Sequence, residues 1–157
     1  MSRNLQKKLL WLFIVLLIAT LAFIFINSML SRDESAELSG SVLDIFDEIV
    51  VFFGGDPDDD HWIRKLAHFI EFAALGFELT VIALLKEQRD FKSLLNCALL
   101  GLLCADIDEG IQIFSSRGSM VQDVFLDFFG VVCGLLIAMF IAGQLRKRFN
   151  KIDKHTD

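Results

Sequence analysis

Four long apolar segments restrict what this chain can fold into more than any other feature. They cover about residues 9–30, 62–85, 91–114 and 121–145. The hydrocarbon core of a bilayer is about 30 Å thick, a distance that roughly 20 apolar residues span as a helix. Hydrophobic residues make up 54% of the chain, and proline occurs once. The sequence therefore predicts an all-α membrane protein, in which four transmembrane helices form a single domain over residues 1–157.

The charges between these segments predict the orientation of the bundle. Lysine and arginine gather before the first segment, between the second and third, and after the fourth. Residues 31–61 instead contain ten acidic residues, one arginine (Arg32) and no lysine. Because basic loops stay on the cytoplasmic side, both termini are predicted inside and residues 31–61 outside. The first segment resembles a signal peptide, but its apolar core is too long for one, so an uncleaved anchor is expected.

The outer loop, residues 31–61, is predicted to contain a short amphipathic helix. Apolar residues recur at helical spacing over residues 42–53, with Ser41 placed to cap the start. The polar face of this helix is acidic, unlike the basic faces that bind anionic lipid, so packing over the bundle is expected. The stretch DPDDD at 56–60 is interpreted as a charged start of the second span, with Pro57 in the first turn. A calcium site is the alternative there.

Ionisable residues of three spans lie at one depth in the outer half of the predicted bundle. With a rise of 1.5 Å per residue, they fall within about 3–14 Å of the outer boundary. They are His68, Glu71, Asp106, Asp108, Glu109, Asp123 and Asp127. A charge in hydrocarbon costs at least about 2.5–3.5 kcal/mol. These acids are therefore predicted to face one another, a cation or water in an outward polar cavity walled by spans two to four. The inner halves are predicted to be nearly free of charge.

The helical faces agree with a shared cavity. His68 and Glu71 are three residues apart and so are neighbours on one side of the second span. Asp108, Glu109 and Gln112 share an edge of the third span, and Asp123 and Asp127 continue into Gly130 and Gly134 on the fourth. The two glycines predict close approach of a neighbouring helix. Arg117, in the connecting turn, is expected at the rim. The alternative is that these charges form salt bridges that only fix the helix packing.

Two stretches of the chain resemble the VanZ-like membrane proteins. They are RKLAHFIEFAALGFE at 64–78 and DEGIQIFSSRGSMVQDVFLDFFGVVCG at 108–134. The matching residues are Lys65, His68, Glu71 and Gly76 in the first stretch, and Asp108, Glu109, Gln112, Arg117, Asp123 and Gly130 in the second. Phe72 replaces the tyrosine of the family pattern, and Asp127 replaces an asparagine. The resemblance implies a multi-pass protein of the bacterial cytoplasmic membrane, in a family linked to low-level resistance to teicoplanin, a lipoglycopeptide.

Three classes of function are compatible with these residues. In the first, the cavity binds or modulates a membrane lipid, a lipid-linked cell-wall precursor or a lipoglycopeptide. The residues assigned to binding are Lys65, Asp108, Glu109, Gln112, Arg117, Asp123 and Asp127. In the second, the protein is a membrane enzyme acting on a lipid head group, with His68 as general acid or base oriented by Glu71. In the third it is a proton-coupled transporter or a lipid-moving protein, and the lack of a polar path through the inner halves disfavours transport by a monomer.

A divalent cation is the cofactor that these acids would hold. Carboxylate oxygens suit Mg²⁺, Ca²⁺ or Mn²⁺, and the candidate ligands are Asp108, Glu109, Asp123 and Asp127. Because like charges repel, the cluster is expected either to bind such an ion or to keep a proton. The three cysteines lie in apolar runs and predict no disulfide framework. Nucleic-acid binding is not expected, because the basic tail is short and follows a span, where it would meet anionic lipid.

Overall fold

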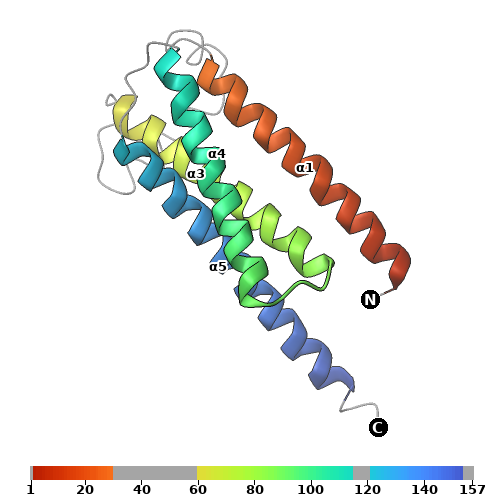
Figure 1. Ribbon diagram of the computed structural model, residues 1–157. Helices are drawn as coiled ribbons and strands as arrows, with labels where there is room; N and C mark the ends of the chain where they lie inside the picture. Colours follow the sequence, from red (N-terminus) through yellow and green to blue (C-terminus); the bar gives the residue numbers. More distant parts are fainter. Residues whose placement is uncertain (1, 30–59, 115–120, 154–157) are drawn as a thin grey trace.

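All regular secondary structure in the described part of the chain is helical (Figure 1). The computed structural model describes residues 2–29, 60–114 and 121–153. Its helices are α1 (Arg3–Met29), α3 (Asp60–Leu85), α4 (Phe91–Phe114) and α5 (Val121–Asp153). The predicted all-α fold is confirmed. The predicted loop helix at 42–53, the acidic stretch before residue 60 and Arg117 all lie outside the described residues.

The helix bounds follow the predicted apolar segments to within two residues except at the start of α1 and the end of α5. α1 begins at Arg3, six residues before the predicted start at residue 9. α4 has the predicted bounds, and α3 begins two residues before the predicted start of the second segment. α5 runs to Asp153, although its apolar segment ends at residue 145. The residues from 146 to 153 contain neither proline nor glycine, so nothing stops the helix where the apolar sequence ends.

Three of these helices are long and apolar enough to cross a membrane. They are α1, α3 over Lys65–Leu85, and α5 over Val121–Arg148. Large apolar side chains cover their outer faces: Trp11, Phe125 and Phe140 are each about two-thirds exposed. Such surfaces are unfavourable in water and suit a bilayer, which makes this a multi-pass membrane protein. α4 has a suitable length but carries three acids in its second half, and its crossing of the membrane stays a prediction.

α3 is the central helix, with α5 packed most extensively against it. α1 contacts α3 and α4, and α4 contacts α3 and α5 (Figure 1). The core cluster draws on all four helices, through Ile24, Phe72, Leu75, Ala105 and Val131. Burial of these apolar side chains therefore fixes the rotation of each helix and, with it, the direction in which the polar residues point.

Glycines set the short distance between α3 and α5. A Cβ atom added to Gly134 would overlap the backbone carbonyl of Ala73, and one added to Gly76 would overlap that of Val131. At Gly130 it would lie 2.5 Å from the carbonyl oxygen of Phe69. The predicted close approach along the Gly130 and Gly134 face of α5 is therefore confirmed, and α3 is the helix that lies there.

The connection between α3 and α4 is a tight helical turn. Glu87 adopts a left-handed conformation (φ 63°), and the Gln88 N–H donates to the Ala83 carbonyl at 3.0 Å, which closes the end of α3. Asp90 then caps α4 by accepting hydrogen bonds from the Ser93 hydroxyl (2.7 Å) and backbone N–H (3.3 Å). The hydroxyl bond lowers the pKa of Asp90 below its ordinary value. This turn returns α4 antiparallel to α3.

The antiparallel packing of the four helices brings their polar ends together. α1 and α4 finish where α3 and α5 begin, and the chain termini lie at the opposite end (Figure 1). We call the first of these the acidic end of the bundle. Both termini thus share one end, as the loop charges predicted, whereas the side of the membrane that each end faces stays a prediction.

Candidate functional site

Asp108 of α4 is the best-connected polar residue at the acidic end. Its side chain is fully buried. One carboxylate oxygen accepts a hydrogen bond from the Ser28 hydroxyl of α1, and the other accepts one from the Gln112 amide at 2.8 Å. These donors come from two helices, so Asp108 is held in one orientation whether or not a ligand is present.

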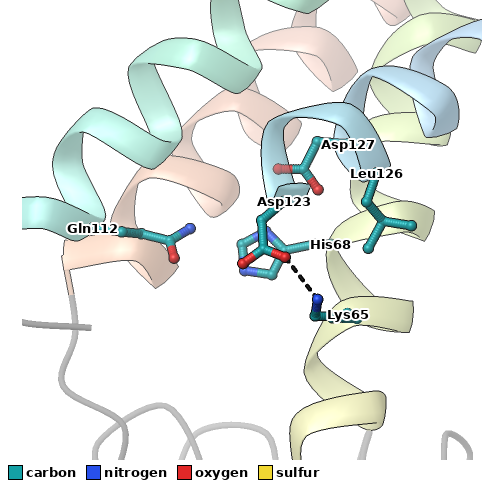
Figure 2. A pocket seen from close by; sticks show the side chains of 6 residues that line it. All are labelled: Lys65, His68, Gln112, Asp123, Leu126 and Asp127. Atoms are coloured by element: carbon teal, nitrogen blue, oxygen red, sulfur yellow. Dashed lines mark ion pairs between the residues drawn. The ribbon is translucent and has the colours of Figure 1, made fainter. Parts of the chain in front are cut away.

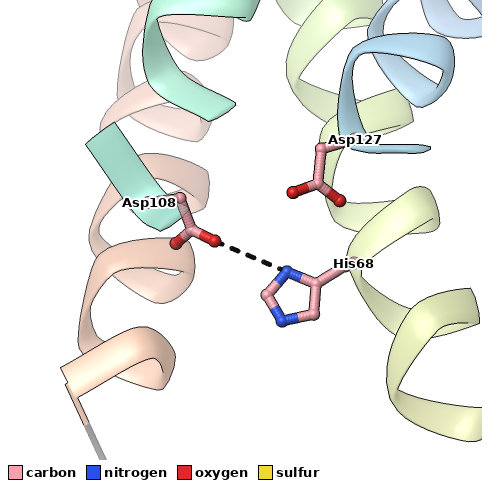
Figure 3. Close-up of side chains that lie close together, drawn as sticks. All are labelled: His68, Asp108 and Asp127. Atoms are coloured by element: carbon pink, nitrogen blue, oxygen red, sulfur yellow. Dashed lines mark ion pairs between the residues drawn. The ribbon is translucent and has the colours of Figure 1, made fainter. Parts of the chain in front are cut away.

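His68 of α3 and Asp127 of α5 face Asp108 across the bundle (Figure 3). The His68 Nδ1 atom lies 3.6 Å from Oδ2 of Asp108, which is an ionic contact too long for a hydrogen bond. Asp127 is 1% exposed, and its Oδ1 atom has no hydrogen-bond partner among the described residues. One nitrogen or oxygen atom from each of the three side chains lies within 4.8 Å of the others. We call these three residues the His–Asp group.

A small pocket opens beside the His–Asp group. Its volume is about 10 Å³, room for about one water molecule or one ion. The lining residues come from α3, α4 and α5, and they are Lys65, His68, Gln112, Asp123, Leu126 and Asp127 (Figure 2). At its edge the Lys65 Nζ atom pairs with Oδ1 of Asp123 at 2.9 Å, with both side chains about one-fifth exposed. The pocket therefore admits a single atom or ion rather than a whole lipid head group.

The electrostatic environment of this pocket is strongly acidic. The charges of Glu71, Asp108, Glu109 and Asp123 all act on Asp127. Five carboxyl groups thus share one neighbourhood with two basic side chains, Lys65 and His68. Because mutual repulsion is strong where water is scarce, this arrangement favours a bound cation or a retained proton.

The remaining predicted residues lie around the group in different ways. Glu109 is buried on α4, and Glu71 is half-buried one turn along α3 from His68. Neither they nor Asp123 contribute an atom to the His–Asp group. Asp106 lies at the predicted depth but is exposed, because two residues turn a helix by about 200° and place it opposite Asp108. The expectation that the acids at this depth face one another does not hold for Asp106.

Two polar contacts of the bundle were not predicted from the sequence. Ser28 joins the site from α1, a helix that was given no part in it. The signal was the polar pair Asn27–Ser28 close to the end of an otherwise apolar segment. The second is Glu78 of α3, which is 8% exposed and accepts a hydrogen bond from Thr20 at 3.0 Å. It lies in the half of α3 that was predicted to be nearly free of charge.

The His–Asp group offers a metal ion one imidazole nitrogen and two carboxylate oxygens. Ca²⁺ and Mg²⁺ prefer all-oxygen ligand sets, whereas Zn²⁺ and Mn²⁺ accept mixed nitrogen and oxygen ligands. The sequence suggested four acids as candidate ligands. The structure groups two of them, Asp108 and Asp127, with His68 instead. Manganese and zinc therefore fit these residues better than calcium or magnesium does.

The sequence profile of VanZ/LLP1 matches residues 13–142. This range includes the whole of the His–Asp group and the pocket beside it, together with most of α1 and α5. No curated protein and no solved structure gives a significant match.

Proposed function

This chain belongs to the VanZ/LLP1 family, and we propose that it is a binding protein of the bacterial cytoplasmic membrane. In this proposal the His–Asp group holds a divalent cation at the outer face, and the cation recruits a phosphate oxygen of an envelope lipid. A cell-wall precursor linked to a lipid phosphate belongs to the same chemical class. Binding of such a lipid would connect the protein to teicoplanin resistance, because the lipid and teicoplanin would meet at the outer face of the membrane.

One observation supports the proposal most strongly: three helices place His68, Asp108 and Asp127 within 4.8 Å of one another in a buried position. Buried acids destabilise a fold unless something compensates their charge. Asp108 has two hydrogen-bond donors, whereas Asp127 keeps an oxygen without one in the described part of the chain. A cation bound between them would satisfy Asp127 and offset the repulsion.

The size of the pocket and its surroundings favour a lipid phosphate as ligand. A cation held by protein carboxylates keeps open positions that phosphate oxygens can take. The pocket admits such an oxygen and excludes the rest of the head group, which would lie over its edge near Lys65. The acyl chains would run along the exposed apolar faces of α4 and α5, where Leu103 and Phe125 are more than half exposed.

A second candidate is an enzyme that hydrolyses or transfers a lipid head group. It is favoured by His68, which lines the pocket with Nδ1 directed at Asp108. An acid beside one imidazole nitrogen leaves the other nitrogen to act as general base or acid. That orienting role was assigned to Glu71 from the sequence, and the contact of 3.6 Å between His68 Nδ1 and Asp108 Oδ2 makes Asp108 a further candidate for it.

Native mass spectrometry of the purified protein with phosphatidylglycerol tests the proposal. We expect Mn²⁺ to increase lipid adducts on the wild type and on Asp106→Asn, a control that removes an exposed acid of the same helix. Asp127→Asn should lose this increase. Equal adducts on all three proteins would contradict the proposal. Conversion of the lipid to a product would favour the enzyme, and Mn²⁺-independent adducts with teicoplanin would favour direct binding of the antibiotic.

A further inference from the structure

Glu78 is a buried acid that lies apart from the acidic end. It is ten residues beyond His68 on α3, about 15 Å further along the helix. Two fully buried apolar side chains, Phe72 and Leu75, lie on the stretch of α3 between them. Glu78 itself is 8% exposed and lies within the stretch of α3 that is apolar enough to cross a membrane. Its carboxyl group is therefore chemically separate from the His–Asp group.

Only one of the two carboxyl oxygens of Glu78 has a donor in the described part of the chain. The Thr20 hydroxyl of α1 donates to Oε1 at 3.0 Å, whereas Oε2 is buried without a hydrogen-bond partner there. Two nearby polar groups are used elsewhere. The Thr80 hydroxyl donates to the Gly76 carbonyl at 2.8 Å, and the Cys97 thiol donates to the Leu79 carbonyl at 3.6 Å.

The helices around Glu78 provide no opposite charge. Aspartate, glutamate, lysine, arginine and histidine are absent from residues 9–29 of α1, 93–105 of α4 and 128–145 of α5. The titratable groups on those stretches are the thiols of Cys97, Cys104 and Cys133, and Glu71 is the nearest acid along α3. An ionised Glu78 would thus be an uncompensated charge inside the bundle, which is strongly unfavourable.

Two ligands could neutralise this carboxyl group, a metal cation or a proton. A hard cation such as Ca²⁺ takes six to eight oxygen ligands, and Mg²⁺ takes an octahedral set. In the described part of the chain, the polar side chain in contact with the carboxyl group of Glu78 is the Thr20 hydroxyl, which falls far short of such a ligand set. A proton needs no further ligands. A neutral acid with one unpaired oxygen also costs far less than an unpaired charge.

We infer that Glu78 is a proton-binding site in the interior of the membrane, with its carboxylic acid held between α1 and α3 by Thr20. Folding keeps a proton on this group that the unfolded chain releases above about pH 4.3. The protonation of Glu78 is therefore coupled to folding, at a place separate from the acidic end. This inference does not depend on which ligand, if any, the His–Asp group binds.

Infrared spectroscopy of the full-length protein in detergent at neutral pH tests the inference. Wild type should show a carbonyl stretch of a protonated carboxylic acid, part of which Glu78→Gln removes. The control Glu87→Gln changes an exposed acid in the turn after α3 and should leave the band intact. Absence of the band in wild type, or an unchanged band in Glu78→Gln, would overturn the inference.

A second variant covers the case in which Glu78→Gln does not fold. Thr20→Val keeps the acid and removes its donor, so the carbonyl band should persist and move to higher frequency. A band that does not move would overturn the inference. Where Glu78→Gln does fold, chemical unfolding gives a further check: the unfolding constant of wild type relative to this variant should rise up to tenfold per pH unit above about pH 4.3, since the folded state holds one more proton. A pH-independent ratio would also contradict it.

Discussion

Replacing Gly134 by alanine should weaken the contact between α3 and α5, which positions His68 against Asp127. The added Cβ would overlap the carbonyl oxygen of Ala73 and lie 2.8 Å from both the Ala73 carbonyl carbon and the Phe77 nitrogen. All three are backbone atoms, so no side-chain rotation relieves the overlap. To restore an ordinary separation of about 3.5 Å from the carbonyl carbon and the Phe77 nitrogen, the helices must move apart by about 0.7 Å, and the closer carbonyl oxygen requires a larger movement.

The size of the effect follows from two opposing contributions. Overpacking of a tight interface costs about 1–3 kcal/mol, and a backbone clash belongs at the upper end of that range. The higher helix propensity of alanine relative to glycine offsets about 1 kcal/mol of this cost. The net loss is about 2 kcal/mol, which corresponds to a decrease of roughly 4–8 °C in the melting temperature of a chain of this size.

Gly143→Ala on the same helix is the matched control, because a Cβ there would meet nothing within 4 Å. This variant should melt at or slightly above the wild-type temperature. The assay is thermal unfolding of the three proteins in one detergent. A melting temperature of Gly134→Ala equal to that of Gly143→Ala would refute the reasoning, since it would mean that the two helices do not meet at this glycine.

Three other predictions concern orientation, the acidic end and the turn after α3. A cysteine at Ser35 should react with an impermeant thiol reagent in intact cells, whereas one at Thr156 should react only after lysis; labelling of the tail from outside would reject the predicted orientation. His68→Ala and Glu71→Ala should each abolish any teicoplanin-resistance phenotype while the protein still accumulates in the membrane; loss of accumulation would instead assign these residues to packing. Glu87→Gly should stabilise the protein by about 1 kcal/mol, because glycine adopts the left-handed conformation without a Cβ penalty, and a lower melting temperature would disprove this.

The sequence was sufficient to predict the existence of the four helices, because each contains a long apolar run bounded by polar residues. Phe91 to Phe114 lies between a basic turn and a polar one, and its predicted bounds are those of α4. α1 and α5 were predicted too short, at the start and at the end respectively, because hydropathy marks where a membrane ends rather than where a helix ends. The glycine face of α5 could also be predicted from the sequence, since Gly130 and Gly134 lie one helical turn apart.

The contacts between helices were harder to predict, because they depend on rotation and register. Depth alone placed Asp106 with Asp108, although the two residues point to opposite sides of α4. The role of Ser28 depends on how α1 packs against α4, and no periodicity in α1 reveals that. Glu78 was visible as a single acid in an apolar run, but its burial and its hydrogen bond with Thr20 required the packed bundle.

A metal-ion series in a thermal-shift assay tests the central proposal most directly. The wild-type protein, freed of metal by chelation, should melt at a higher temperature with Mn²⁺ or Zn²⁺ than with Ca²⁺ or Mg²⁺. An ion at one hundred times its dissociation constant stabilises the folded state by about 2.7 kcal/mol, or roughly 5–11 °C at this chain length. Asp127→Asn should lose that increase and Asp106→Asn should keep it. A melting temperature indifferent to every ion, or an equal increase in both variants, would contradict a cation site at His68, Asp108 and Asp127.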